Sequence, residues 1–433
     1  MTIKSLIMPH LAATLSSPAL KSARRGVHAA RRRLRRHIHT LDVFLKLDDP
    51  YSFLLIQVLP QLSQRFDIDV HLHTVETLPA EMFPEQALWT QHAFDDAKWL
   101  SSIYELDFPS DVPSQSVASC LPALLEAEMR RDLHAMTTVF RAFWLGDSDL
   151  PSAAQTNETG ARLAANEALL EKLGHYNSAM IYCDGEWYWG LDRLDHLESR
   201  LMEEGAARST AESMRFNRTW KPLCSGDAES VAGDAKKPAE LVMYFSARSP
   251  YSFLGLELAA ALCERQQIDL IIKPVLPMVM RGMPVPKNKK MYIFLDTKRE
   301  ADKLGIPYGR VADPLGAGVE RCYALFDYAR SQGKERDFLL SFARRVNAEG
   351  VRSEMDSGMR QIVEQAGLDW REAKPLLATC HDAGAGWRDW AQKNLDELYR
   401  FGQWGVPCFR YRDLCVWGQD RLYRIEKKVR AEN

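Results

Sequence analysis

Three short motifs in the C-terminal half of this 433-residue chain contain residues that could do chemistry. In the first, Ser249 stands directly before Pro250, at the predicted start of a helix. Ser before Pro is a common helix opening, in which the hydroxyl caps the first turn. The same position has unsatisfied N–H groups and the positive end of the helix dipole, so it also suits an anion such as a thiolate. Ser249 is therefore either a plain N-cap or a group that lowers the pKa of a bound thiol.

The other two motifs are GVPC and WGQDR. In GVPC, Pro407 follows Val406 at the predicted entry to a strand, where a proline alone has an ordinary structural role. In WGQDR, Asp420 is expected to begin the last helix, where a carboxylate alone stabilises the helix dipole. Gln419 directly precedes it.

All three motifs lie in the second copy of an internal repeat. The segment LDVFLKLDDPYSFLL, from Leu41, aligns without a gap with LVMYFSARSPYSFLG, from Leu241. The ends of the copies, from Asn166 and Asn394, align in the same way. Each copy is predicted as strand, helix, strand, then a mainly helical stretch, then helix, strand, strand and helix.

This order of elements is the thioredoxin arrangement, with the helical insertion of its DsbA-like variant. SPYSFLGLELAAAL, KLGIPYG, GVPCF and VWGQDRL resemble the 2-hydroxychromene-2-carboxylate isomerases and the kappa-class glutathione transferases. The resemblance implies an α/β fold class with two tandem DsbA-type thioredoxin-like domains. The expected organisation is a basic N-terminal extension at 1–40, a degenerate domain at 41–203, a linker at 204–239 and a domain with the active site at 240–433.

The resemblance also assigns roles to residues of the second copy. A serine at the position of Ser249 contacts the sulfur of glutathione in these families, so Ser249 is the expected catalytic residue. The bond before Pro407 is expected to be cis, which leaves the backbone of Val406 to pair with glutathione. Gln419 and Asp420 are expected to hold the γ-glutamyl end of glutathione.

Three further residues are candidates for binding the substrate. Tyr251 lies in the same motif as Ser249, and Lys289 and Lys290 follow a proline-containing segment. A lysine there could neutralise a substrate carboxylate, although loop lysines that are simply solvated are the alternative. Met283 stands where relatives often have an asparagine that helps to hold glutathione, which weakens or alters the expected glutathione binding.

The first copy departs from the family pattern. It has Asp49 in place of the serine, and Ser178 with Ala179 in place of the valine and proline, but it retains Asp192. Aspartate is a good N-cap, so the helix is expected to form, but its carboxylate would repel a thiolate. The first copy is therefore not expected to be the catalytic half.

Charge is distributed unevenly along the chain. Of its 56 Lys and Arg, nine lie in residues 1–40, which contain no acidic residue, so the remaining residues have 47 basic and 58 acidic side chains. This acidic balance argues against a nucleic-acid groove, and no apolar run approaches the ~18 residues of a membrane span. The basic leader has three open interpretations: an arm on the acidic body, a contact with an anionic membrane or nucleic acid, and an organellar targeting peptide.

The eight cysteines include no CxxC pair, which is typical of a reducing compartment, so a cytoplasmic location is expected, with organellar targeting by the leader as the alternative. The pattern also removes the usual redox dithiol and a four-cysteine zinc site, and no metal is expected. Cys408 follows Pro407, and Cys415 lies on the next predicted strand, where the two thiols could face each other. Cys408 is either a buried small hydrophobe or a redox group.

The sequence therefore predicts a glutathione-dependent isomerase or transferase with one competent site, in the second copy. The expected partners are glutathione as cosubstrate and a small electrophilic, aromatic substrate, without nucleic acid. Two alternatives remain open: a non-catalytic thioredoxin-like protein that binds a peptide or thiol, and a DsbA-like thiol-disulfide oxidoreductase acting through Cys408. The chain is expected to be a monomer or a homodimer, because a tandem chain can satisfy internally the contact through which relatives dimerise.

Overall fold

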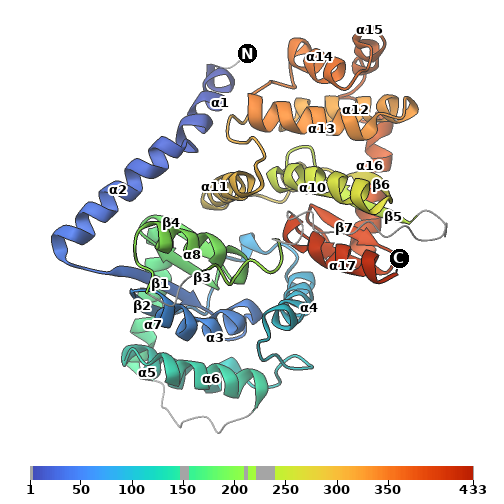
Figure 1. The fold of residues 1–433 in the computed structure, drawn as a ribbon. Helices are drawn as coiled ribbons and strands as arrows, with labels where there is room; N and C mark the ends of the chain where they lie inside the picture. The colour runs from blue at the N-terminus through green and yellow to red at the C-terminus, as the bar shows by residue number, and fades with distance from the viewer. Residues whose placement is uncertain (1–2, 147–155, 209–212, 221–238, 433) are drawn as a thin grey trace. The chain divides into compact units, whose positions relative to one another are not determined.

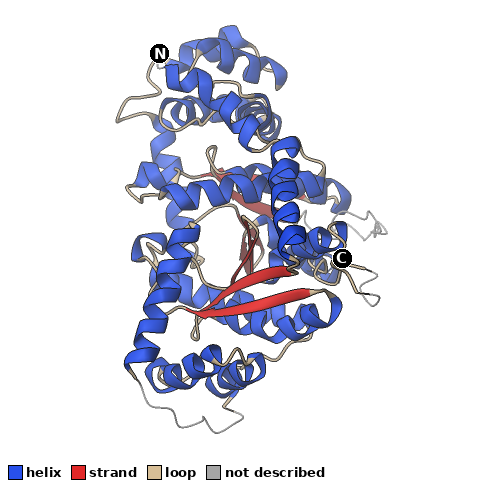
Figure 2. Cartoon of the chain, turned by 90° about the vertical axis from the view of Figure 1, so that its left-hand side faces the viewer, coloured by secondary structure: helices blue, strands red, loops and turns tan. Residues whose placement is uncertain are grey.

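The computed structural model describes residues 3–146, 156–208, 213–220 and 239–432. It contains two four-stranded sheets with the same plan, ordered β2-β1-β3-β4 and β6-β5-β7-β8. In each sheet the first two strands are parallel and the other pairs are antiparallel. Figure 2 shows these strands in red with helices around them. The structure confirms the predicted α/β class with two copies of a thioredoxin-like plan.

The first copy follows the predicted order of elements. Its opening βαβ unit comprises β1 (His39–Leu45), α3 (Pro50–Arg65) and β2 (Ile68–Thr74). The helical insertion comprises α4 (Gln86–Tyr104), α5 (Val117–Met129), α6 (Leu133–Leu145) and α7 (Asn157–Leu173). The copy closes with β3 (Met180–Cys183), β4 (Glu186–Trp189), a 3₁₀ turn (Leu191–Arg193) and α8 (Leu194–Glu203).

The second copy repeats this order with a longer insertion. Its opening unit comprises β5 (Glu240–Phe245), α10 (Pro250–Gln266) and β6 (Asp269–Pro274). The insertion comprises α11 (Lys287–Leu304), α12 (Ala317–Ser331), α13 (Glu335–Arg344), α14 (Asp356–Gln365), α15 (Trp370–Ala373) and α16 (Gly386–Arg400). The copy closes with β7 (Cys408–Tyr411), β8 (Leu414–Trp417), a 3₁₀ turn (Gln419–Arg421) and α17 (Leu422–Glu432).

The chain divides into two compact units. The N-terminal unit comprises Ser22–Thr219 and Pro286–Tyr292, and the C-terminal unit comprises Met1–Lys21, Trp220–Val285 and Ile293–Asn433. Each unit has its own hydrophobic core around its central strand. Val43 in β1 and Met243 in β5 are fully buried, as are their strand neighbours Phe44 and Tyr244, which point to the opposite face. Burial on both faces is expected for a sheet covered by helices on both sides.

The basic leader folds as α1 (Ile3–Leu15) and α2 (Pro18–Arg35). In the N-terminal unit, Arg25 Nε donates to Glu186 Oε1 at 2.6 Å, and Arg25 Nη2 donates to Glu186 Oε2 at 2.9 Å. Two turns further along α2, Arg32 forms ion pairs with Asp184 and Glu204. Bidentate and repeated arginine–carboxylate pairs fix a helix more firmly than single surface pairs do. Within the described residues, α2 is therefore held on the N-terminal unit by ion pairs, as the interpretation of the leader as an arm on the acidic body expects.

Part of the predicted linker also packs on the N-terminal unit. Phe216 is buried, and its ring lies 5.7 Å from that of Tyr104. The backbone N–H groups of Arg215 and Phe216 donate to the Glu198 carboxylate at 2.8 and 3.1 Å. Residues 209–212 and 221–238 of the predicted linker lie outside the described residues.

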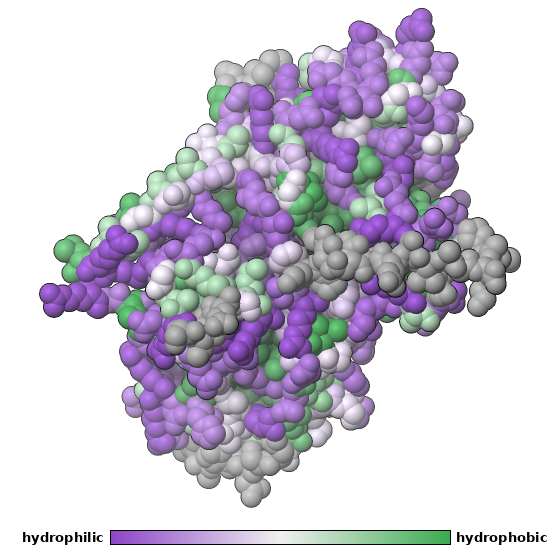
Figure 3. All heavy atoms as spheres, viewed as in Figure 1, coloured by the Kyte–Doolittle hydropathy of each residue, from purple (hydrophilic) through white to green (hydrophobic). Residues whose placement is uncertain are grey.

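The surface agrees with the polar composition. Hydrophilic side chains predominate on the face seen in Figure 3. None of the described helices is long and apolar enough to cross a membrane.

Candidate functional site

Ser249 lies at the start of α10, as predicted, and caps it. Its hydroxyl oxygen accepts a hydrogen bond from the Ser252 N–H at 3.1 Å, and Pro250 occupies the first helical position. The hydroxyl also donates to the Val406 carbonyl oxygen at 3.4 Å. A contact of this length is at the weak end of the hydrogen-bond range, so the hydroxyl proton can turn to a stronger acceptor at small cost. The structure therefore brings Ser249 and Val406 together at a helix N-terminus.

The peptide bond between Val406 and Pro407 is cis. The Pro407 carbonyl oxygen accepts from the Gly418 N–H at 2.8 Å, which joins this segment to the end of β8. On the other side, α10 approaches Pro407 through Gly255. A Cβ at Gly255 would lie 2.9 Å from the Phe409 ring and 3.3 Å from Pro407 Cβ, so the helix reaches this position only because residue 255 has no side chain.

Gln419 and Asp420 lie in the 3₁₀ turn before α17, against which α10 packs. The expectation that Asp420 begins the last helix is therefore corrected by two residues, because α17 starts at Leu422. Gln419 is buried, and its Nε2 donates to Asp420 Oδ2 at 3.2 Å. The turn thus presents an oriented carboxylate, which is suited to an ammonium group.

Tyr251 is hydrogen-bonded to a buried carboxylate. Its hydroxyl donates to Asp296 Oδ2 at 2.7 Å, and Arg299 forms an ion pair with the same aspartate. The first copy contains the same contact, from the Tyr51 hydroxyl to Asp96 Oδ2 at 2.8 Å. The tyrosine and the aspartate are 45 residues apart in each copy, so the repeated spacing marks Asp296 in the sequence as well. Because the contact recurs in both copies, it does not distinguish the copy expected to be catalytic, and the role of Tyr251 in substrate binding stays a prediction.

Lys289 and Lys290 belong to the N-terminal unit, whereas Ser249 belongs to the C-terminal unit. Lys289 Nζ donates to the Met82 carbonyl oxygen at 2.7 Å and lies 5.7 Å from the centre of the Tyr176 ring. Burial lowers the pKa of Lys289 to about 8. Lys290 is exposed. Their role in substrate binding stays a prediction.

Cys408 is a buried thiol. Its Sγ donates to the Gly405 carbonyl oxygen at 3.1 Å, and burial raises its pKa well above the usual range. Cys415 is also free, and it is opposite Arg410 rather than Cys408 in the β7–β8 register. The expectation that the two thiols face each other is wrong by two residues. A protonated, buried thiol favours the interpretation of Cys408 as a small hydrophobe.

The equivalent position of the first copy holds a carboxyl group. Asp49 caps α3 by accepting from the Tyr51 and Ser52 N–H groups, each at 3.2 Å. Its Oδ2 also accepts from the Ser178 hydroxyl at 2.8 Å. Burial raises the pKa of Asp49, although these hydrogen bonds oppose the shift.

The space beside this carboxyl is filled differently as well. Leu55, fully buried, stands at the position of Gly255, and Ala179, also fully buried, stands at the position of Pro407. Ala179 adopts a left-handed backbone with φ of +54°, whereas Pro407 follows a cis bond. A large side chain on the helix thus accompanies a small one on the turn, and the reverse holds in the second copy.

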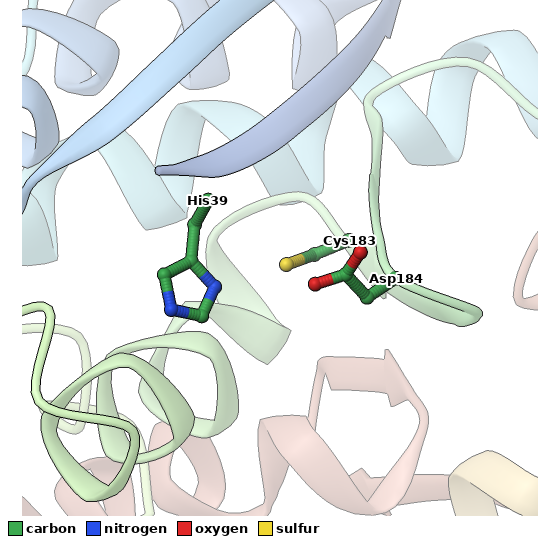
Figure 4. A group of neighbouring side chains, drawn as sticks. All are labelled: His39, Cys183 and Asp184. Carbon is green, nitrogen blue, oxygen red and sulfur yellow. The ribbon is translucent and has the colours of Figure 1, made fainter. Parts of the chain in front are cut away.

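One group of metal-ligand side-chain types is present among the described residues. His39, Cys183 and Asp184 have ligand atoms within 4.8 Å of one another, and Figure 4 shows the sulfur and the carboxylate directed toward the imidazole. Burial raises the pKa of the Cys183 thiol to about 12. Asp184 already pairs with Arg32, and Arg200 Nη2 lies 3.8 Å away. These cations oppose a bound metal ion, so the group is better explained as part of the ion pairs that hold α2.

Comparison with known proteins finds a family match in the C-terminal half. Residues 240–430 match the DsbA-like thioredoxin domain family. The curated 2-hydroxychromene-2-carboxylate isomerase of Sphingobium xenophagum is 26% identical over 191 residues, covering 42% of this chain and 94% of that protein. These matches confirm the predicted resemblance of this half of the chain to DsbA-like domains and to 2-hydroxychromene-2-carboxylate isomerase, while the resemblance to kappa-class glutathione transferases stays a prediction.

Solved structures also match part of this chain. A 2-hydroxychromene-2-carboxylate isomerase is 20% identical, covers 45% of this chain and 95% of its own, and superposes with a TM-score of 0.38. The cytosolic disulfide reductase DsbM from Pseudomonas aeruginosa is 18% identical, covers 45% of this chain and 98% of its own, and has a TM-score of 0.36.

Proposed function

We propose that the C-terminal unit is a glutathione-dependent isomerase or transferase that acts on a small electrophilic, aromatic substrate. The similarity of this half of the chain to a 2-hydroxychromene-2-carboxylate isomerase supports the reaction class. The observation that carries the proposal is the Ser249 hydroxyl at the N-terminus of α10, which accepts from the Ser252 N–H at 3.1 Å and donates to the Val406 carbonyl oxygen through a long 3.4 Å contact. A neutral donor at a helix N-terminus is an arrangement that stabilises a thiolate.

The residues of this chain would act by orienting and stabilising the thiol. When bound, glutathione supplies a sulfur nucleophile that adds reversibly to an electron-poor double bond and leaves after rotation or ring change. Ser249 turns its hydroxyl proton from Val406 to the sulfur, which lowers the pKa of the thiol together with the helix dipole. Val406 receives glutathione through its backbone, and Asp420, oriented by Gln419, holds the γ-glutamyl ammonium. Placement then supplies much of the rate.

Thiol-disulfide exchange through Cys408 is less well supported. Exchange needs an accessible thiolate, whereas the Cys408 thiol is fully buried and burial raises its pKa. Cys408→Ala is therefore expected to retain activity, while removal of the Ser249 hydroxyl is expected to abolish it. The opposite pattern would favour the oxidoreductase.

The test is calorimetric titration of glutathione into the wild type and into variants that separate capping from thiol binding. Glycine is almost as good an N-cap as serine, so Ser249→Gly removes the hydroxyl and preserves the helix start. We expect Ser249→Gly and Asp420→Asn each to weaken binding roughly tenfold or more, since each loses a hydrogen bond to a charged group. No heat and no thermal shift from the wild type at millimolar glutathione would refute the glutathione proposal and leave a non-catalytic binding protein.

A further inference from the structure

A separate cavity of about 290 Å³ lies in the C-terminal unit at the start of α14. Its lining has no acidic residue and includes His10, Arg310, Arg352, Ser357, Gly358 and Gln361. None of these residues belongs to the site around Ser249, so the cavity is independent of the function proposed above.

Two arginines give this cavity its charge. Among the residues that the structure describes, neither the Arg310 nor the Arg352 guanidinium has a carboxylate partner. Arg352 Nη1 is buried and without any hydrogen-bond partner. Other arginines of this unit do have such partners, as Arg248 does in Asp313 at 2.7 Å. A buried, unsatisfied guanidinium N–H is costly unless an anion satisfies it.

The first turn of α14 adds further donors. Met355, at the N-cap, provides no side-chain cap, so the orphan N–H groups of this turn are available. A Cβ at Gly358 would lie 2.0 Å from the Arg352 carbonyl oxygen, so only glycine lets Arg352 lie against the helix start. The nearby Asp356 carboxylate does not fill the cavity, because it pairs with Arg321 at 2.6 Å and Lys374 at 3.3 Å. Backbone donors and helix dipole therefore both favour an anion here.

The first leader helix forms one wall of the cavity. Pro9 and His10 of α1 belong to the lining, and α1 runs beside the segment between α13 and α14 (Figure 1). Gly350, with φ of +71°, permits this approach, since a Cβ there would lie 2.9 Å from Pro9 Cβ. Gly309 does the same for Ser16, with a Cβ–Oγ distance of 2.5 Å. The cavity is thus assembled from two distant parts of the sequence.

We propose that this cavity binds a phosphate group, either as free phosphate or as part of a small phosphate ester. Two guanidinium groups, a serine hydroxyl and helix N–H groups offer more hydrogen-bond donors than the two oxygens of a carboxylate can accept. This number of donors fits the oxygens of a phosphate group. The volume is at the lower end of the range for ligand pockets, so it suits a molecule of about the size of a sugar phosphate.

The test is calorimetric titration of inorganic phosphate and of ribose 5-phosphate into the full chain at constant ionic strength. The wild type is expected to bind at least one of the two saturably. Arg310→Gln and Arg352→Gln are each expected to weaken binding tenfold or more. Arg371→Gln is the matched control, because it removes one positive charge from an arginine that is paired with Asp369 outside the cavity. Ser249→Gly is the second control and should bind phosphate as the wild type does.

The outcomes separate the sources of the ligand. Saturable binding of inorganic phosphate alone indicates free phosphate, and tighter binding of ribose 5-phosphate indicates an ester. Circular dichroism shows whether Arg352→Gln is folded. Arg310 is exposed, so Arg310→Gln is expected to fold and tests phosphate binding even if Arg352→Gln unfolds. Absence of saturable binding to the wild type, or an equal loss in Arg371→Gln, would overturn the proposal.

Discussion

The Ser178 hydroxyl donates a 2.8 Å hydrogen bond to the Asp49 carboxylate in the N-terminal unit. In the matching pair of the C-terminal unit, Ser249 donates from the helix to the Val406 carbonyl oxygen at 3.4 Å. Each pair joins the start of a helix to the turn before a strand, but donor and acceptor are exchanged. The N-terminal unit therefore has a carboxyl group where the C-terminal unit has a neutral donor.

Replacing Ser249 with aspartate should transfer this difference to the C-terminal unit. Aspartate caps a helix as well as serine does, so we expect Ser249→Asp to keep the unfolding free energy within about 1 kcal/mol of the wild type. Its negative charge should abolish measurable glutathione binding, because it repels a thiolate at the same helix end. Calorimetry with glutathione and urea unfolding check the two parts. Wild-type affinity in this variant would contradict the assignment of Ser249.

A side chain at Gly255 should disturb the packing of α10 on Pro407. Ala at this position would place Cβ 2.9 Å from the Phe409 ring, so we expect Gly255→Ala to lower stability by about 1–3 kcal/mol. Gly384→Ala is the matched control, since no atom lies within 4 Å of a Cβ there. Urea unfolding of both variants measures the difference. Equal stability of the two would show that α10 can shift away from β7.

Asp49 should make the N-terminal unit less stable as the pH rises. Burial raises its pKa above the unfolded value of about 3.9, so the folded state binds more protons than the unfolded chain between these two values. Stability is therefore lost as the pH rises through this window. Asp49→Asn removes this titration but keeps an acceptor for Ser178. Urea unfolding at pH 4 and pH 7 measures the free energy of unfolding of both proteins. The stability of Asp49→Asn relative to the wild type should be higher at pH 7 than at pH 4, and a difference that does not change with pH would contradict this.

Lys289 should titrate separately from the other lysines. Burial lowers its pKa to about 8, so NMR of lysine side chains should show one group with a midpoint near that pH, and Lys289→Arg should remove it. The unfolded chain keeps this proton up to about pH 10.4, so stability should rise with pH between the two values. Exposed Lys290 provides the comparison, and Lys290→Arg should leave the unusual signal in place.

The sequence predicted what depends on local pattern. The two helix starts at Asp49 and Ser249 follow from the residues before each proline, and the repeat predicts that both copies share one strand order. The pair of Tyr251 and Asp296 was visible in the same way, because its spacing recurs in the first copy.

Contacts between distant segments were not predictable from pattern. Arg25 pairs with Glu186 over a separation of 161 residues, and only the folded chain shows which of the leader arginines face carboxylates. The register of the β7–β8 hairpin places Trp417 opposite Cys408 and Arg410 opposite Cys415. The two thiols are therefore diagonal neighbours rather than a facing pair, and the sequence did not show this register. Gly255 looked like an ordinary small residue in a helix, since the Phe409 ring that excludes a side chain there lies far away in sequence.

The exchange of sizes between helix and turn constrains how either copy can change in evolution. Leu55 and Ala179 are both fully buried in the first copy, whereas in the second a Cβ at Gly255 would meet the Phe409 ring and Pro407. A single substitution toward the opposite arrangement creates either a clash or a void, and each costs a few kcal/mol. The two positions are therefore expected to show epistasis, so that duplicated copies of this kind diverge through paired substitutions and seldom revert.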